Sequence, residues 1–61
     1  MVETLEDVDR LLAEALPRGG IIRHKARNIA AALVVYRHMP DAELWEAILA
    51  SAQVLALMLE E

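Results

Sequence analysis

The segment from residue 41 to residue 60 constrains the fold most, because apolar side chains cover more than half of the helix it would form. At about 100° per residue, ten apolar side chains fall within an arc of about 220°. One antiparallel neighbour cannot cover so wide a surface. Helices of the same chain can cover one flank, and the other flank needs a further partner. The ten residues are Leu44, Trp45, Ile48, Leu49, Ala52, Val54, Leu55, Ala56, Met58 and Leu59.

Two short segments interrupt an otherwise helical pattern. Pro17 disfavours helical geometry at the residue before it, and the glycines at 19 and 20 can adopt positive φ. Pro40 marks the second break. The spacing of apolar residues predicts helices over residues 4–16, 21–39 and 41–60. The sequence therefore predicts one all-α domain over residues 1–61, with a three-helix protomer made of a helical hairpin plus a long C-terminal helix.

Side chains suited to capping precede the first and third predicted helices. Thr4 is a candidate N-cap, with Asp7 three positions later in the arrangement of a capping box. Asp41 is the candidate N-cap of the third helix, and Pro40 at the first helical position is the competing frame.

The size and composition of the chain favour completion of its core by another subunit. It has 61 residues, of which 57% are hydrophobic, whereas ordinary soluble domains have roughly 45–50% apolar residues. A chain of this length hides only about 60% of its unfolded surface when it folds alone. The absence of cysteine excludes disulfides and thiolate zinc sites. We therefore expect a helical bundle formed by oligomerisation, with no metal and no cofactor.

The third helix and the second half of the second helix are the expected interface, with the first helix outside as a lid. The partner is a second copy, in a homodimer or a higher oligomer; a helix of another protein is the alternative. Trp45 is a candidate anchor of this interface, and packing in the core is its other possible role. The candidate interface residues are Val34, Leu44, Trp45, Ile48, Leu49, Ala52, Leu55, Met58 and Leu59.

Charge is sorted along the chain. Residues 1–16 hold five acids and one arginine, residues 17–39 hold five cations and no acid, and residues 40–61 hold five acids and no cation. The cations can pair with the acidic faces of the other helices, within the chain or across an interface. Alternatively, they form an anion site at the start of the second helix, where backbone N–H groups favour negative charge. The candidate anion-binding residues are Arg18, Arg23, His24 and Arg27.

Several features argue against nucleic acid as the partner. The net charge of −4 gives no broad positive field for phosphates. In a helix-turn-helix, residues 41–60 would be the recognition helix, yet they carry acids and leucines where Arg, Lys, Asn or Gln should read bases.

His24 and His38 lie about 21 Å apart along one helix and cannot share a metal within one protomer.

The sequence contains no constellation of catalytic residues. Ser51 is the only serine, there is no cysteine, and the glycine pair at 19 and 20 is no phosphate loop. We therefore expect no enzymatic activity.

The expected location is the cytoplasm. The longest uninterrupted apolar run, Ile29–Tyr36, is far below the roughly 18 residues of a membrane span, and the N-terminus is acidic where an export signal is basic. Five arginines to one lysine and the many alanines suggest a GC-rich bacterial genome.

Taken together, these features predict a small homo-oligomeric interaction or regulatory protein without catalysis, with a nucleic-acid- or anion-binding regulator as the alternative.

Overall fold

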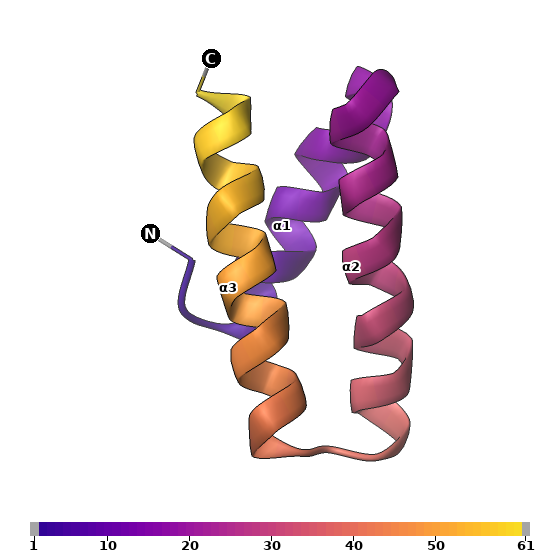
Figure 1. Cartoon of the computed structure of the whole chain (residues 1–61), viewed down its shortest axis with the longest axis vertical. Coiled ribbons are helices and arrows are strands. Elements are labelled where there is room, and N and C mark those ends of the chain that lie inside the picture. Colours follow the sequence, from indigo (N-terminus) through magenta and orange to yellow (C-terminus); the bar gives the residue numbers. More distant parts are fainter. Residues whose placement is uncertain (1, 61) are drawn as a thin grey trace.

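The computed structural model describes residues 2–60 and contains three α-helices (Figure 1). Helix α1 spans Leu5–Ala15, α2 spans Gly20–His38 and α3 spans Ala42–Leu59, and a short 3-10 turn, η1, spans Leu16–Arg18. No strand occurs in the range described. The prediction of an all-α, three-helix chain is confirmed, and each helix begins and ends within one residue of the predicted range.

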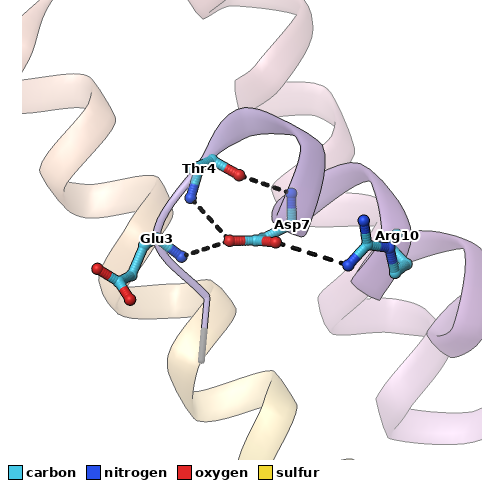
Figure 2. A network of polar contacts seen from close by, with 4 residues as sticks. All are labelled: Glu3, Thr4, Asp7 and Arg10. Carbon is cyan, nitrogen blue, oxygen red and sulfur yellow. Dashed lines mark hydrogen bonds and ion pairs between the residues drawn. The ribbon is translucent and has the colours of Figure 1, made fainter.

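Helix α1 begins at a capping box (Figure 2). The Thr4 hydroxyl accepts a hydrogen bond from the backbone N–H of Asp7 at 3.1 Å. The Asp7 carboxylate in turn accepts bonds from the backbone N–H groups of Glu3 and Thr4, both at 3.1 Å, and lies 3.7 Å from the Arg10 guanidinium. The backbone N–H of Glu3, followed by that of Thr4, lowers the pKa of Asp7 below its ordinary value. The predicted capping of α1 is therefore confirmed.

The capping box should make a pH-dependent contribution to stability. Because the pKa of Asp7 is lowered in the folded chain, its stabilisation is present above the ordinary carboxyl pKa and is lost as pH falls through the folded value. In urea unfolding, Asp7→Asn should therefore be less stable than the wild type at about pH 7, and the two should converge as the pH falls below the folded pKa of Asp7. Thr4→Ala should cost about 1 kcal/mol. A difference between Asp7→Asn and the wild type that is independent of pH would contradict this account.

Two glycines with positive φ lie at the start of α2, Gly19 as its N-cap and Gly20 as its first residue. Gly19 has a φ of 77° and Gly20 a φ of 63°, a region in which side chains are strained. This reversal follows Pro17 in η1, so the predicted break is found where the sequence places it. The turn is also tied to the far end of the chain, because the Arg18 guanidinium donates to the Leu59 carbonyl at 3.2 Å. A cation at the last turn of α3 interacts favourably with the negative end of that helix dipole.

Helices α2 and α3 form an antiparallel pair, and α1 crosses behind them in the view of Figure 1. All three helices contribute to the core, and each supplies one alanine with no exposed surface: Ala15, Ala26 and Ala52. Helix α1 was expected to be an outer lid. Instead, Val8, Leu11, Leu12 and Ala15 of its apolar stripe are buried and Leu5 is half-buried, so α1 forms part of the core. The buried residues are Val2, Val8, Leu11, Leu12, Ala15, Ala26, Ile29, Leu33, Ile48, Ala52 and Leu55.

Three residues expected at an interface between copies lie inside the single chain. Ile48, Ala52 and Leu55 are 2%, 0% and 0% exposed. The expectation left only one flank of α3 to the other helices of the chain, whereas α1 and α2 together bury the middle of its apolar arc. These three side chains are therefore corrected from interface to core.

Candidate interaction surface

Much of the remaining apolar surface is not covered by the chain itself. Six large apolar side chains are between 47% and 73% exposed: Ile21, Val34, Val35, Met39, Val54 and Leu57. Of the predicted interface residues outside the core, Val34 is exposed and Met58 is half-buried. The others are half-buried against the core: Leu44, Trp45, Leu49 and Leu59.

The exposed apolar side chains gather on one side of the α2–α3 pair. At about 100° per residue, Ile21, Val35 and Met39 fall on the side of α2 opposite the α1 side, and Val54 and Leu57 fall on the same side of α3. We call this side the hairpin face; Figure 1 looks directly onto it, with α1 behind. Its other members are His24, Asn28, Ala31, Ala32, Glu43, Ala47, Ala50, Ser51 and Met58.

Contacts to the N-terminal third of the chain define the opposite side of α2. The Arg37 guanidinium binds the Asp9 carboxylate of α1 at 2.8 Å, and Arg23, Arg27 and Ala30 line a hollow against Leu16. Val34 lies one turn beyond Ala30 and belongs to that side. Five of the six exposed apolar side chains are therefore on the hairpin face, and the sixth, Val34, is not.

A shallow groove runs between α2 and α3 on the hairpin face. It comprises two adjoining hollows of about 130 Å³ and about 120 Å³. Ligand pockets usually measure about 300–1,000 Å³, so each hollow has room for a side chain of a partner and not for a drug-sized ligand. The lining is mostly apolar and small, with one cation: Lys25, Asn28, Ile29, Ala32, Leu44, Ala47, Ile48 and Ser51.

Trp45 does not stand free on the surface. Its ring packs on Tyr36 with the ring centroids 5.4 Å apart and the planes tilted by 37°. Both residues lie against the core near the Met39–Asp41 connection, and both are half-buried. The pair joins α2 to α3 and so helps to hold the hairpin face in shape.

The four candidate anion-binding residues do not converge. Arg18 is engaged with the Leu59 carbonyl, and the helical period places His24 toward the outer edge of the hairpin face. Arg23 and Arg27 do lie together, in the hollow beside Leu16. Ion pairs within residues 2–60 join only Arg10 to Asp7 and Arg37 to Asp9, so Arg23, Lys25 and Arg27 have no acidic partner there. Of the cations in residues 17–39, only Arg37 therefore forms an ion pair with another helix of the same chain.

Between Val2 and Glu60, no polar or charged side chain is buried, and no group of three or more His, Asp or Glu is placed to hold a metal ion. Sequence reasoning missed five exposed residues as surface candidates: Ile21, Val35, Met39, Val54 and Leu57. The helical period of α2 and α3 places these residues on a common side of the helix pair. To identify that side as exposed, one also needs to know on which side α1 packs.

Helix α3 has the length and composition of a membrane span. Its 18 residues have a mean hydropathy of 1.5, and 17% of them are buried within the fold. The core helix of a soluble bundle meets the same two criteria, so hydropathy alone does not assign α3 to a membrane.

Comparison with known proteins gives no further guide to function. No protein-family model, no curated protein and no solved structure matches the chain. Its function has to be inferred from its own surfaces.

Proposed function

We propose that this chain is a small cytoplasmic interaction protein without catalysis of its own, which forms a homodimer through the hairpin face. One observation carries the proposal: five large apolar side chains, each at least 47% exposed, lie on a single face. Scattered exposed apolar residues are normal on soluble proteins, whereas a contiguous apolar face is typical of an interaction site.

The dimensions of the hairpin face suit a dimer. The fold measures 31 × 20 × 16 Å between Cα atoms, and the hairpin face spans the two longer dimensions. The outline of the fold in this view therefore covers about 600 Å² per copy, or about 1,200 Å² for two copies, comparable to the roughly 1,000 Å² of a specific interface. The accessible surface of 4339 Å² is also about a tenth larger than the roughly 3,950 Å² expected of a compact monomer of this mass.

A second copy suits the hairpin face better than an unrelated helix does. The face carries two charged side chains, Lys25 on α2 and the exposed Glu43 on α3, one turn before Ala47. These two opposite charges lie on the two sides of the groove, whereas Arg23, Arg27 and Arg37 lie on the α1 side of α2. A surface with one basic and one acidic flank is complementary to a copy of itself.

Light scattering coupled to size exclusion tests the proposal. At about 50 µM the wild type should have twice the 6.8 kDa mass of the chain, and the mass should fall on dilution. A monomer at that concentration would overturn the proposal. If such a monomer also floated with anionic lipid vesicles, a membrane surface would replace the second copy as the partner of the apolar face.

Two unpaired arginines support anion or nucleic-acid binding as a second candidate function. Arg23 and Arg27 have no acidic partner within residues 2–60, and they share one hollow near the start of α2. Gly19 caps that helix without a side-chain hydrogen bond. Backbone N–H groups at such a helix start attract anions.

Titration with duplex and single-stranded DNA at low salt tests this candidate. If it is correct, the wild type binds, and the double variant Arg23→Ala/Arg27→Ala reduces the slope of log affinity against log salt by about 2, one for each lost phosphate contact. Arg37→Ala is the matched control, because Arg37 is already paired with Asp9. A wild type that binds no DNA at low salt removes the candidate.

A further inference from the structure

We infer that the hollow around Arg23 and Arg27 binds a small amphipathic anion, in which a phosphate or carboxylate group carries a short alkyl chain. The hollow has a volume of about 440 Å³ and is lined by Leu16, Arg23, Arg27 and Ala30. We call it the arginine hollow. The inference goes beyond the proposed dimer and does not depend on it, and it assigns to the two arginines a small ligand in place of a nucleic acid.

The two guanidinium groups suit the charged end of such a ligand. Arg23 and Arg27 lie one turn apart on α2, and neither has an acidic partner in the part of the chain that the structure describes. Guanidinium groups bind phosphate and carboxylate oxygens through paired, charge-assisted hydrogen bonds. Arg23 is also the fourth residue of α2, close to the positive end of the helix dipole, where a cation is disfavoured. A bound anion compensates for both unpaired charges.

The rest of the lining suits an apolar group. Leu16 and Ala30 are half-buried, and the stems of the two arginines add methylene groups beside them. Val34 is exposed, lies one turn beyond Ala30 and continues the apolar surface along α2. From Arg27 to Val34 this surface runs for about 10 Å. An alkyl chain attached to the anion covers it, whereas inorganic phosphate leaves it in contact with water.

The surroundings favour a small ligand over a polymer. Ligand pockets usually measure about 300–1,000 Å³, so the arginine hollow has room for a small molecule. The net charge of the chain is −4, because residues 1–16 and 40–61 hold all ten acids and only one cation. A nucleic acid extends its phosphates beyond the hollow toward these acids, whereas a single anion interacts with the two arginines alone.

Isothermal titration calorimetry with octyl phosphate, below the concentration at which it forms micelles, tests the inference. The wild type should bind octyl phosphate at least about tenfold more tightly than butyl phosphate, because each CH2 group that becomes buried raises affinity by up to about fourfold. Inorganic phosphate and the uncharged octyl glucoside should both bind more weakly than octyl phosphate, again by about tenfold or more. Equal binding of octyl phosphate and octyl glucoside overturns the inference, because it indicates unspecific binding to exposed apolar surface such as the hairpin face.

Variants locate the binding site. Arg23→Gln/Arg27→Gln keeps most of each stem, removes both charges and should weaken octyl phosphate binding by about tenfold or more. Arg37→Gln is the matched control, because Arg37 is paired within the chain. Val34→Ser should reduce the preference for octyl over butyl phosphate, and Val35→Ser on the hairpin face should not. Unchanged binding in the double variant, or no binding by the wild type, overturns the inference, and light scattering of the same samples tests the dimer separately.

Urea unfolding without ligand distinguishes a binding role of the arginines from a structural one. Cations one turn apart on a helix repel each other. Arg23→Gln/Arg27→Gln should therefore unfold at the same urea concentration as the wild type or at a higher one. A lower urea midpoint shows that the two charges stabilise the fold, and it overturns the inference.

Vesicles distinguish two sources of the anion, a membrane lipid and a free amphiphile. The wild type and the double variant are sedimented with vesicles of equal parts phosphatidylglycerol and phosphatidylcholine. Sedimentation that requires the two arginines assigns the ligand to a membrane leaflet. Binding of octyl phosphate without such sedimentation assigns it to a free amphiphile.

Discussion

Replacement of Leu55 by alanine should leave most of the chain unfolded at 25 °C. Leu55 has no exposed surface and lies at the centre of the core. Truncation of such a leucine costs about 2–5 kcal/mol, and a single core in a chain of this length supplies only about 3–5 kcal/mol. Far-UV circular dichroism should show loss of most of the helical signal, and the urea midpoint should fall toward zero.

Leu57→Ala is the matched control for this result. It makes the same chemical change two residues away on α3, at a side chain that is 64% exposed. Because Leu57 lies on the hairpin face, any cost of its truncation should shrink as the protein is diluted, whereas the cost at Leu55 should persist at every concentration. Equal losses at both positions in dilute solution would contradict the placement of Leu55 in the core.

Val35→Glu should convert the dimer into a folded monomer. Val35 is 55% exposed in the single chain and lies on the hairpin face, so a second copy would bury it. An unpaired carboxylate in an apolar interface costs several kcal/mol, and about 3 kcal/mol corresponds to a rise in Kd of more than a hundredfold. Light scattering should report the mass of one chain while circular dichroism retains the helical signal.

The neighbouring valine provides the control for Val35. Val34 is exposed to nearly the same extent, 57%, but lies on the α1 side of α2. Val34→Glu adds the same charge to the same helix and should leave the dimer intact. Dissociation by Val34→Glu and not by Val35→Glu would show that copies meet through the other side of α2, where the sequence prediction placed Val34.

The helices and their ends were predictable because their signals are local. The apolar period indicates each helix, Pro17 and Pro40 mark the breaks, and the capping box needs only Thr4 and Asp7. These features depend on residues within one or two turns of each other. The structure therefore agrees with the sequence on element number, type and bounds.

The division of α3 between core and surface was not predictable, because it depends on where α1 crosses. The wide apolar arc indicates that α3 has several neighbours, but it does not say which of them belong to the same chain. Leu55 and Leu57 look alike in the sequence, yet one is buried and the other exposed. Val34 and Val35 also look alike in the sequence, and both are exposed. Only the position of α1 shows that they lie on different sides of α2.

The partners of the cations were equally hidden. Arg37 pairs with Asp9, 28 residues away, and Arg18 binds a backbone carbonyl 41 residues away. Neither contact has a sequence pattern, since both arise from the way the helices come together. Charge sorting along the chain indicates that pairing is available, and the packing of the helices decides which pairs form.

The three fully buried alanines set a limit on how this chain can diverge. Where a helix presents only a methyl group, its neighbours approach to the short end of the usual interaxial range, about 8 Å, and any larger side chain forces the backbones apart. In descendants of this sequence, leucines, isoleucines and valines can exchange with one another at modest cost. Ala15, Ala26 and Ala52 have no such substitutes, so the smallest side chains of the core should be the slowest to evolve.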